Sequence, residues 1–145
     1  MSSALYQAEI KRLARLECPR YSLPDSDHSI TLDNPLCGDR VTMDFHIQDG
    51  RISAQAHRVR GCLLCRASAN LIAGAIPGTP LSDLGAIKDC AVKLLQGGPD
   101  PSLVSGWEAL ALFQPVANYK SRHECVLLPF RALISAAEQH RNSKG

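Results

Sequence analysis

The strongest constraint on the fold of this chain is a pair of short segments on either side of Asp49-Gly50. Residues 41–47 alternate apolar and polar side chains, and residues 51–59 form a second such run directly after Gly50. Asp-Gly between two alternating runs is the strongest short-range signal for a β-hairpin. The sequence therefore predicts an antiparallel sheet built on these two strands.

Helical patterns lie on both sides of the hairpin. Residues 3–17 place leucine and isoleucine at helical spacing, and the Cys18-Pro19 step ends this helix because the residue before a proline disfavours the α region. Residues 20–36 show no period, so we expect a loop there. The other predicted helices cover residues 62–75, 80–84, 86–95, 107–113 (ended before Pro115) and 122 to about 139, where Pro129 is an alternative start of the last helix.

These elements predict one α+β domain over residues 1–145, in which a small antiparallel sheet packs against several helices. The hairpin supplies two strands of this sheet, and the sequence leaves undecided whether there is a third. Residues 97–101 are expected to form a break, and residues 142–145 a frayed tail. A chain of 145 residues is long enough to bury a core without disulfide staples.

Charge and composition exclude some classes of partner. The net charge is +2, too balanced to argue for nucleic acid or an anionic membrane, and no apolar run approaches the roughly 20 residues of a membrane span. The N-terminus shows no basic segment followed by an apolar one, so we expect no secretory signal and a cytoplasmic location. In a reducing cytosol, the six cysteines are expected to be metal ligands, reactive thiols or core residues.

Three cysteine motifs far apart in the chain suggest a metal site. They are Cys37-Gly38-Asp39, Gly61-Cys62 and Cys125. Three thiols and one carboxylate make four ligands, the number that a tetrahedral zinc or an iron–sulfur half-site needs. No motif is a site by itself, so the prediction requires a fold that gathers all three.

Cys62 has the most informative local context. It follows Gly61 where the second strand should turn into a helix. The first N–H groups of a helix have no intrahelical partner and carry partial positive charge, which favours a thiolate there. We therefore expect Cys62 to have a lowered pKa, to bind metal and to be nucleophilic toward sulfur.

The remaining cysteines and the histidines have simpler interpretations. Cys18 and Cys90 are expected to be small core residues. Taken alone, Cys37 could belong to an ordinary tight turn. Each histidine is expected to be a surface residue rather than a ligand, with His123, two residues before Cys125, kept as the exception.

In order and separation, the three motifs resemble those of the IscU/SufU/NifU N-terminal family of iron–sulfur cluster assembly scaffolds and sulfur acceptors. The resemblance runs from about residue 3 to residue 140, and rests on 34–39 (Asn-Pro-Leu-Cys-Gly-Asp), Gly61-Cys62 with Ala67-Ser68, and Arg122-x-x-Cys125. The segment from roughly Gly97 to Pro115 is similar to an insertion of the SufU branch. IscU proteins have a histidine where Glu124 stands here, and a Leu-Pro-Pro-Val-Lys motif that this chain lacks.

This resemblance implies a zinc held by Cys37, Asp39, Cys62 and Cys125 in the resting state. It implies that Cys62 accepts persulfide sulfur from a pyridoxal-phosphate-dependent cysteine desulfurase, with Cys125 as the other acceptor candidate. The protein is then at most a zinc-dependent sulfurtransferase, and otherwise a scaffold without enzymatic activity. In a second hypothesis, the same four residues hold a transient [2Fe–2S] cluster for delivery to apoproteins or carriers.

Cys65 departs from the family, because relatives usually have another residue there. Three helical steps place Cys65 near the face of Cys62, one turn into the helix, so we predict that it points partly into the core and is not a ligand. A dithiol oxidoreductase using Cys62 and Cys65 is the alternative function, because Cys-x-x-Cys at a helix N-terminus is the thioredoxin arrangement. Against it, a hairpin rather than a βαβ unit precedes Cys62.

Overall fold

The computed structural model of the protein describes residues 8–16, 22–97 and 104–144. In chain order its elements are α1 (Ala8–Arg15), β1 (His28–Asn34), β2 (Asp39–Gln48), β3 (Arg51–Arg60), α2 (Leu63–Ala75), β4 (Thr79–Pro80), η2 (Leu81–Asp83), α3 (Leu84–Leu95), η3 (Glu108–Asn118), η4 (Lys120–Arg122) and α4 (His123–Lys144). The three η elements are 3-10 helices. The order confirms the predicted α+β class.

The predicted hairpin is present. β2 and β3 pair antiparallel, and the pair Gln48–Arg51 closes a two-residue turn. Both turn residues have positive φ, 54° at Asp49 and 73° at Gly50, as a tight turn matched to the twist of its strands requires. Val41, Met43 and Phe45 lie on the buried face of the sheet. The alternation in the sequence therefore reflects a strand with one buried and one more exposed face.

The sheet has two strands that the sequence analysis did not assign. Residues 28–34, which were predicted as part of a loop, form β1 and pair along their whole length with β2. The short β4 pairs with the start of β3, so that the strand order is β1-β2-β3-β4. β1 alternates between exposed and more buried residues from Ser29 to Asp33, a strand signal that the loop prediction overlooked, whereas β4 has only two residues and is too short to show any alternation.

The helices follow the prediction, with two corrections at prolines. The last helix, α4, starts at His123 and contains Pro129, and it continues to Lys144 through residues predicted as a frayed tail. The 3-10 helix η3 runs through Pro115, where a helix ending at Phe113 was expected. The N-terminal helix is described only for Ala8–Arg15, and the Cys18-Pro19 step lies outside the described residues.

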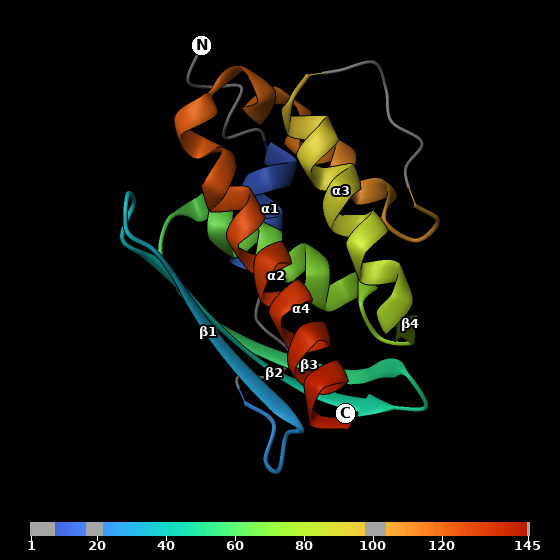
Figure 1. The fold of residues 1–145 in the computed structure, drawn as a ribbon. Helices are drawn as coiled ribbons and strands as arrows, with labels where there is room; N and C mark the ends of the chain where they lie inside the picture. The colour runs from blue at the N-terminus through green and yellow to red at the C-terminus, as the bar shows by residue number, and fades with distance from the viewer. Residues whose placement is uncertain (1–7, 17–21, 98–103, 145) are drawn as a thin grey trace.

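The helices pack on one face of the sheet (Figure 1). The sheet side of the core includes Met43 and Phe45, and the helix side includes Leu64, Ile72 and Phe130, all at most 1% exposed. α4 lies over β1 and β2 and beside α2 and α3. Within the described residues, no helix is both long and apolar enough to cross a bilayer.

Candidate metal centre

Three segments far apart in the sequence meet at one end of the sheet. They are the turn between β1 and β2, the connection from β3 to α2, and the start of α4. Figure 1 shows them at the left of the view, where the two strand ends approach the first turns of α2 and α4. These segments carry Cys37, Asp39, Cys62 and Cys125, so the fold brings together the four residues that the sequence selected.

The β1–β2 turn is held by the last residue of β1. The Asn34 carbonyl accepts hydrogen bonds from the N–H groups of Cys37 and Gly38, at 3.2 and 2.8 Å. The Asn34 side-chain oxygen accepts the N–H of Leu36 at 3.1 Å. Gly38 has φ 74°, a conformation that glycine adopts without the strain of a side chain. This turn leaves Cys37 exposed at the mouth of the site and directs Asp39 into it.

Asp39 is buried against the start of α2. Asp39 is 1% exposed to solvent. Oδ1 accepts a hydrogen bond from the backbone N–H of Cys62 at 2.9 Å, and Oδ2 lies 3.8 Å from Cys62 Sγ. One carboxylate oxygen therefore binds the backbone at the N-terminus of α2, and the other faces the thiols.

The thiols complete the cluster. Cys125 Sγ lies 3.6 Å from Cys37 Sγ, and one ligand atom from each of Cys37, Asp39 and Cys125 lies within 4.8 Å of the others. Two sulfurs on a tetrahedral zinc, each about 2.3 Å from the metal, lie about 3.8 Å apart. The 3.6 Å spacing of the Cys37 and Cys125 sulfurs is close to this value, so these two thiols and the Asp39 carboxylate fit a small tetrahedral metal, with Cys62 beside Asp39 as the fourth donor.

The hydrogen bond between Cys62 and Cys125 shifts the pKa values of the two thiols in opposite directions. Together with the backbone N–H groups of Cys65 and Leu64, and against burial and the charge of Asp39, it lowers the pKa of Cys62 to about 6. The same hydrogen bond, together with burial, raises the pKa of Cys125. The pair therefore favours the thiolate at Cys62 and the protonated thiol at Cys125. This agrees with the lowered pKa expected for Cys62.

The two other described cysteines, Cys65 and Cys90, lie in the core. Cys65 is 0% exposed, and burial raises its pKa, so it is a buried thiol that supplies its backbone N–H to Cys62. Neither Cys65 nor Cys62 is among the three residues whose ligand atoms lie within 4.8 Å of one another in the described part of the chain, but Cys62 Sγ lies 3.8 Å from Asp39 Oδ2 of that group. Cys90 is buried on α3, as expected for a core residue. Cys18 lies outside the described residues.

The histidines take no place in the cluster. His123 Nε2 lies 3.1 Å from the Ala117 carbonyl oxygen, which ties the start of α4 to η3. His57, expected to be a surface residue rather than a ligand, is instead 4% exposed and lies on the sheet face that the helices cover. The sequence did not show on which face of β3 His57 lies, and that face determines whether its side chain is buried.

Ser68, one of the residues that carry the family resemblance, also links α2 to α4, and the sequence did not predict this contact. Proline at position 129 supplies no N–H to the Cys125 carbonyl, so the first turns of α4 lack one regular hydrogen bond. The buried Ser68 hydroxyl donates to the next carbonyl, that of Val126, at 2.6 Å. Ser68 thus ties α2 to α4 one residue from Cys125.

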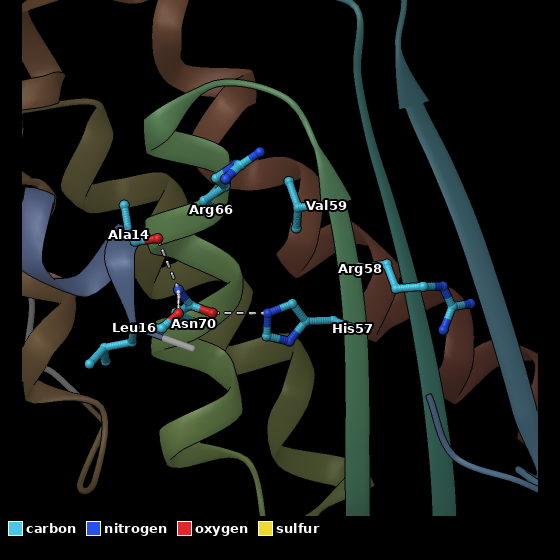
Figure 2. Close-up of a pocket in the computed structure, with 7 residues that line it drawn as sticks. All are labelled: Ala14, Leu16, His57, Arg58, Val59, Arg66 and Asn70. Atoms are coloured by element: carbon cyan, nitrogen blue, oxygen red, sulfur yellow. Dashed lines mark hydrogen bonds between the residues drawn. The ribbon is translucent and has the colours of Figure 1, made fainter. Parts of the chain in front are cut away.

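A second polar cluster on α2 has a different character. The pocket in Figure 2, of about 200 Å³, lies between the end of α1, the middle of α2 and β3, and no cysteine lines it. Asn70 donates to the carbonyls of Leu13 and Leu16 at 2.8 and 3.2 Å, and its side-chain oxygen lies 3.0 Å from His57 Nε2. Asn70 therefore fastens the end of α1 to the sheet. This arrangement is structural.

Comparison with known proteins identifies the family. Residues 13–126 match the NifU-like N terminal domain family, and the chain belongs to it. Two curated relatives are iron–sulfur cluster assembly scaffold proteins named IscU. The one from Streptococcus pyogenes is 27% identical over 83% of this chain and 75% of its own length. The one from Thermotoga maritima is 25% identical over 73% of each chain.

Solved structures agree with this assignment. The N-terminal NifU-like protein from Brucella abortus superposes with a TM-score of 0.89, at 29% identity over 97% of each chain. A candidate scaffold protein for the SUF system from Fervidobacterium islandicum has a TM-score of 0.86 at 23% identity, covers 94% of this chain and 99% of its own, and supports the fold alone. The protein is thus a homologue of iron–sulfur cluster assembly scaffolds. None of these four proteins is described as a dithiol oxidoreductase.

Proposed function

We propose that the protein is a scaffold for iron–sulfur cluster assembly and that it accepts sulfur from a cysteine desulfurase. Family membership supports the process. The cluster of Cys37, Asp39 and Cys125, with Cys62 beside Asp39, supports the place where it occurs. The observation that carries the proposal is that this cluster forms from three separate segments at one end of the sheet.

The four residues are the ligands of the proposed metal. A resident zinc would keep the thiols deprotonated and unreactive until a partner displaces a ligand. Asp39 is the weakest of the four ligands, because a carboxylate is hard and exchangeable beside thiolates. Cys37 is exposed, so the site opens to the surface on its side. A [2Fe–2S] cluster that uses the same ligands would be cargo, delivered to apoproteins or carriers.

Sulfur acceptance needs one thiolate that a partner can reach. The Cys62 thiolate attacks the outer sulfur of a persulfide on a pyridoxal-phosphate-dependent desulfurase. A bond forms between Cys62 Sγ and that sulfur, and the partner's cysteine leaves as a thiolate, so no electrons are gained or lost overall. Cys125, which starts as the thiol, is the second acceptor. A cytoplasmic, reducing location, as the sequence predicts, would keep these thiols free.

Metal analysis tests the ligand set. Protein purified without added metal should hold about one equivalent of zinc, and single alanine variants of Cys37, Cys62 and Cys125 should lose it. Cys90→Ala is the matched control, because Cys90 is a buried cysteine on α3 outside the cluster. Full zinc content in the three ligand variants would contradict the assignment.

Two further measurements separate the acceptor from the scaffold. Cys62→Ala should abolish the stimulation of alanine release by a desulfurase, and unchanged release would contradict sulfur transfer through Cys62. Anaerobic reconstitution with iron and sulfide should produce sulfide-to-iron charge-transfer absorption if a cluster assembles here. Absence of these bands would exclude the cluster and leave sulfur transfer alone.

A further inference from the structure

Gly61 lies against Asp39 more closely than any side chain would allow. A Cβ at residue 61 would overlap Asp39 Oδ1 and lie 2.9 Å from Asp39 Cγ. Of the eight glycines whose surroundings the structure describes, only Gly61 has this crowding, and a Cβ on the others would meet nothing closer than 3.9 Å. The absence of a side chain at this position therefore makes room for a particular carboxylate.

Backbone conformation does not explain this glycine. The positive-φ glycines that the structure describes are Gly38, Gly50, Gly78, Gly97 and Gly106, and Gly61 is not among them. An alanine could adopt the backbone of residue 61. The requirement for glycine comes from the neighbouring Asp39 side chain, which approaches from β2.

This contact determines how the two oxygens of Asp39 are used. Oδ1 can accept the Cys62 N–H at 2.9 Å because the carboxylate lies directly against the Cα of Gly61. With Oδ1 bound to the backbone at the start of α2, Oδ2 is the oxygen that faces Cys62 Sγ, at 3.8 Å. A side chain at residue 61 would push the carboxylate away from α2, and both contacts would change.

We propose that Gly61 is a positioning residue that orients Asp39 so that Oδ1 binds the Cys62 N–H and Oδ2 is turned toward Cys62 Sγ. This inference rests on the proposed function, since it assigns the orientation of one proposed ligand. It also makes a claim about the metal-free protein, because the contact between residues 39 and 61 exists without metal. The two claims are therefore tested separately.

A double-mutant cycle tests the proposal. Gly61→Ala is made in the wild-type chain and in Asp39→Ala, where the carboxylate that it would strike is gone. Gly74→Ala is the matched control, because Gly74 lies in α2 and a Cβ there meets nothing within 4 Å. Each variant is unfolded with urea without metal, and its zinc affinity is measured by competition with a chelator.

In the metal-free protein, Gly61→Ala should lower the urea midpoint clearly in the wild-type background. It should have a much smaller effect in Asp39→Ala, where the nearest remaining atom is a Cβ at 3.1 Å. Gly74→Ala should not lower the midpoint in either background. Equal shifts by Gly61→Ala in the two backgrounds, or no shift in either, would overturn the proposal. If Gly61→Ala fails to fold, folding of the double variant supports it, and failure of both overturns it.

Zinc affinity provides the second readout. Displacing a group that orients a ligand typically reduces metal affinity about 10- to 100-fold, and we expect a loss of this size for Gly61→Ala. In the Asp39→Ala background the further loss should be about twofold or less. A similar loss in both backgrounds would show that glycine serves another purpose. If the wild-type chain binds no zinc, the proposed metal site fails, and the urea cycle alone decides the role of Gly61.

Discussion

Two aspartates of β2 are buried on opposite sides of the sheet, and they have different surroundings. Asp44 is 5% exposed and accepts hydrogen bonds from the Ser29 hydroxyl, the Arg58 guanidinium and the Leu23 N–H, at 2.7, 3.1 and 3.2 Å. Figure 2 shows the Arg58 side chain on the far side of the sheet from α2. Asp39 is 1% exposed and accepts one backbone N–H, and its other oxygen faces a thiol.

The comparison shows that burial alone does not mark a functional carboxylate. Burying a charge is costly unless hydrogen bonds compensate it, and Asp44 is compensated on both oxygens. Asp39 is at least as buried and accepts only one backbone N–H, and its other oxygen has a thiol as its neighbour, so that oxygen is the one placed to bind a metal. The donors around each carboxylate therefore distinguish the structural aspartate from the proposed ligand.

The largest expected effect on stability is that of Asp44→Ala. It removes three hydrogen bonds, one of them the partly buried ion pair with Arg58, so the free energy of unfolding should fall by about 3 kcal/mol. Zinc content of the folded protein should not change, because the network lies on the opposite face of the sheet. Urea unfolding and metal analysis measure the two effects. Loss of zinc from folded Asp44→Ala would contradict the assignment of Asp44 as a structural residue separate from the metal site.

Asp39→Ala should have the opposite profile. It removes one hydrogen bond at the start of α2, worth about 1 kcal/mol of unfolding free energy. Zinc affinity should fall about tenfold or more, because a proposed ligand is lost. Chelator competition and urea unfolding, measured on the same preparation as Asp44→Ala, give the comparison. A large loss of stability with unchanged zinc affinity would make Asp39 a structural residue like Asp44.

The pH dependence of stability should identify Asp44 in particular. Burial raises its pKa, but the hydrogen bonds from Ser29, Arg58 and the Leu23 N–H outweigh this, and the pKa lies below the ordinary value of an aspartate. A lowered native pKa contributes stability above the unfolded pKa of about 3.9, and this stability is lost as the pH falls through the native pKa. Unfolding free energy should therefore fall more steeply with acidification in the wild-type chain than in Asp44→Asn. Parallel curves between about pH 5 and pH 2 would refute this assignment.

The smallest effect on the site is expected for Cys65→Ser. Cys65 is fully buried, so a hydroxyl in its place should reduce stability by about 1–2 kcal/mol. The variant should keep about one equivalent of zinc and most of the desulfurase stimulation, because the backbone N–H that Cys65 supplies to Cys62 is unchanged. Loss of zinc in Cys65→Ser, with zinc retained in Asp39→Ala, would show that the fourth ligand is Cys65.

Features that depend on neighbouring residues could be predicted from the sequence alone. The β2–β3 hairpin follows from alternation and the Asp49-Gly50 turn, and α2 follows from its run of alanine and leucine. The lowered pKa of Cys62 follows from its place at a helix N-terminus, although its hydrogen bond with Cys125 is the larger cause. The order of the three cysteine motifs was sufficient to indicate the family.

Features that depend on distant residues were decided only by the tertiary structure. The place of β1 at the edge of the sheet comes from its pairing with β2, and α4 continues through Pro129 with the Ser68 hydroxyl bound to its first turns. The crowding of Gly61 against Asp39 joins residues 22 positions apart in the chain. Such contacts arise from the packing of whole elements, and short-range patterns do not encode them. For this reason the sequence could select the four proposed ligands, whereas the orientation of Asp39 among them required the fold.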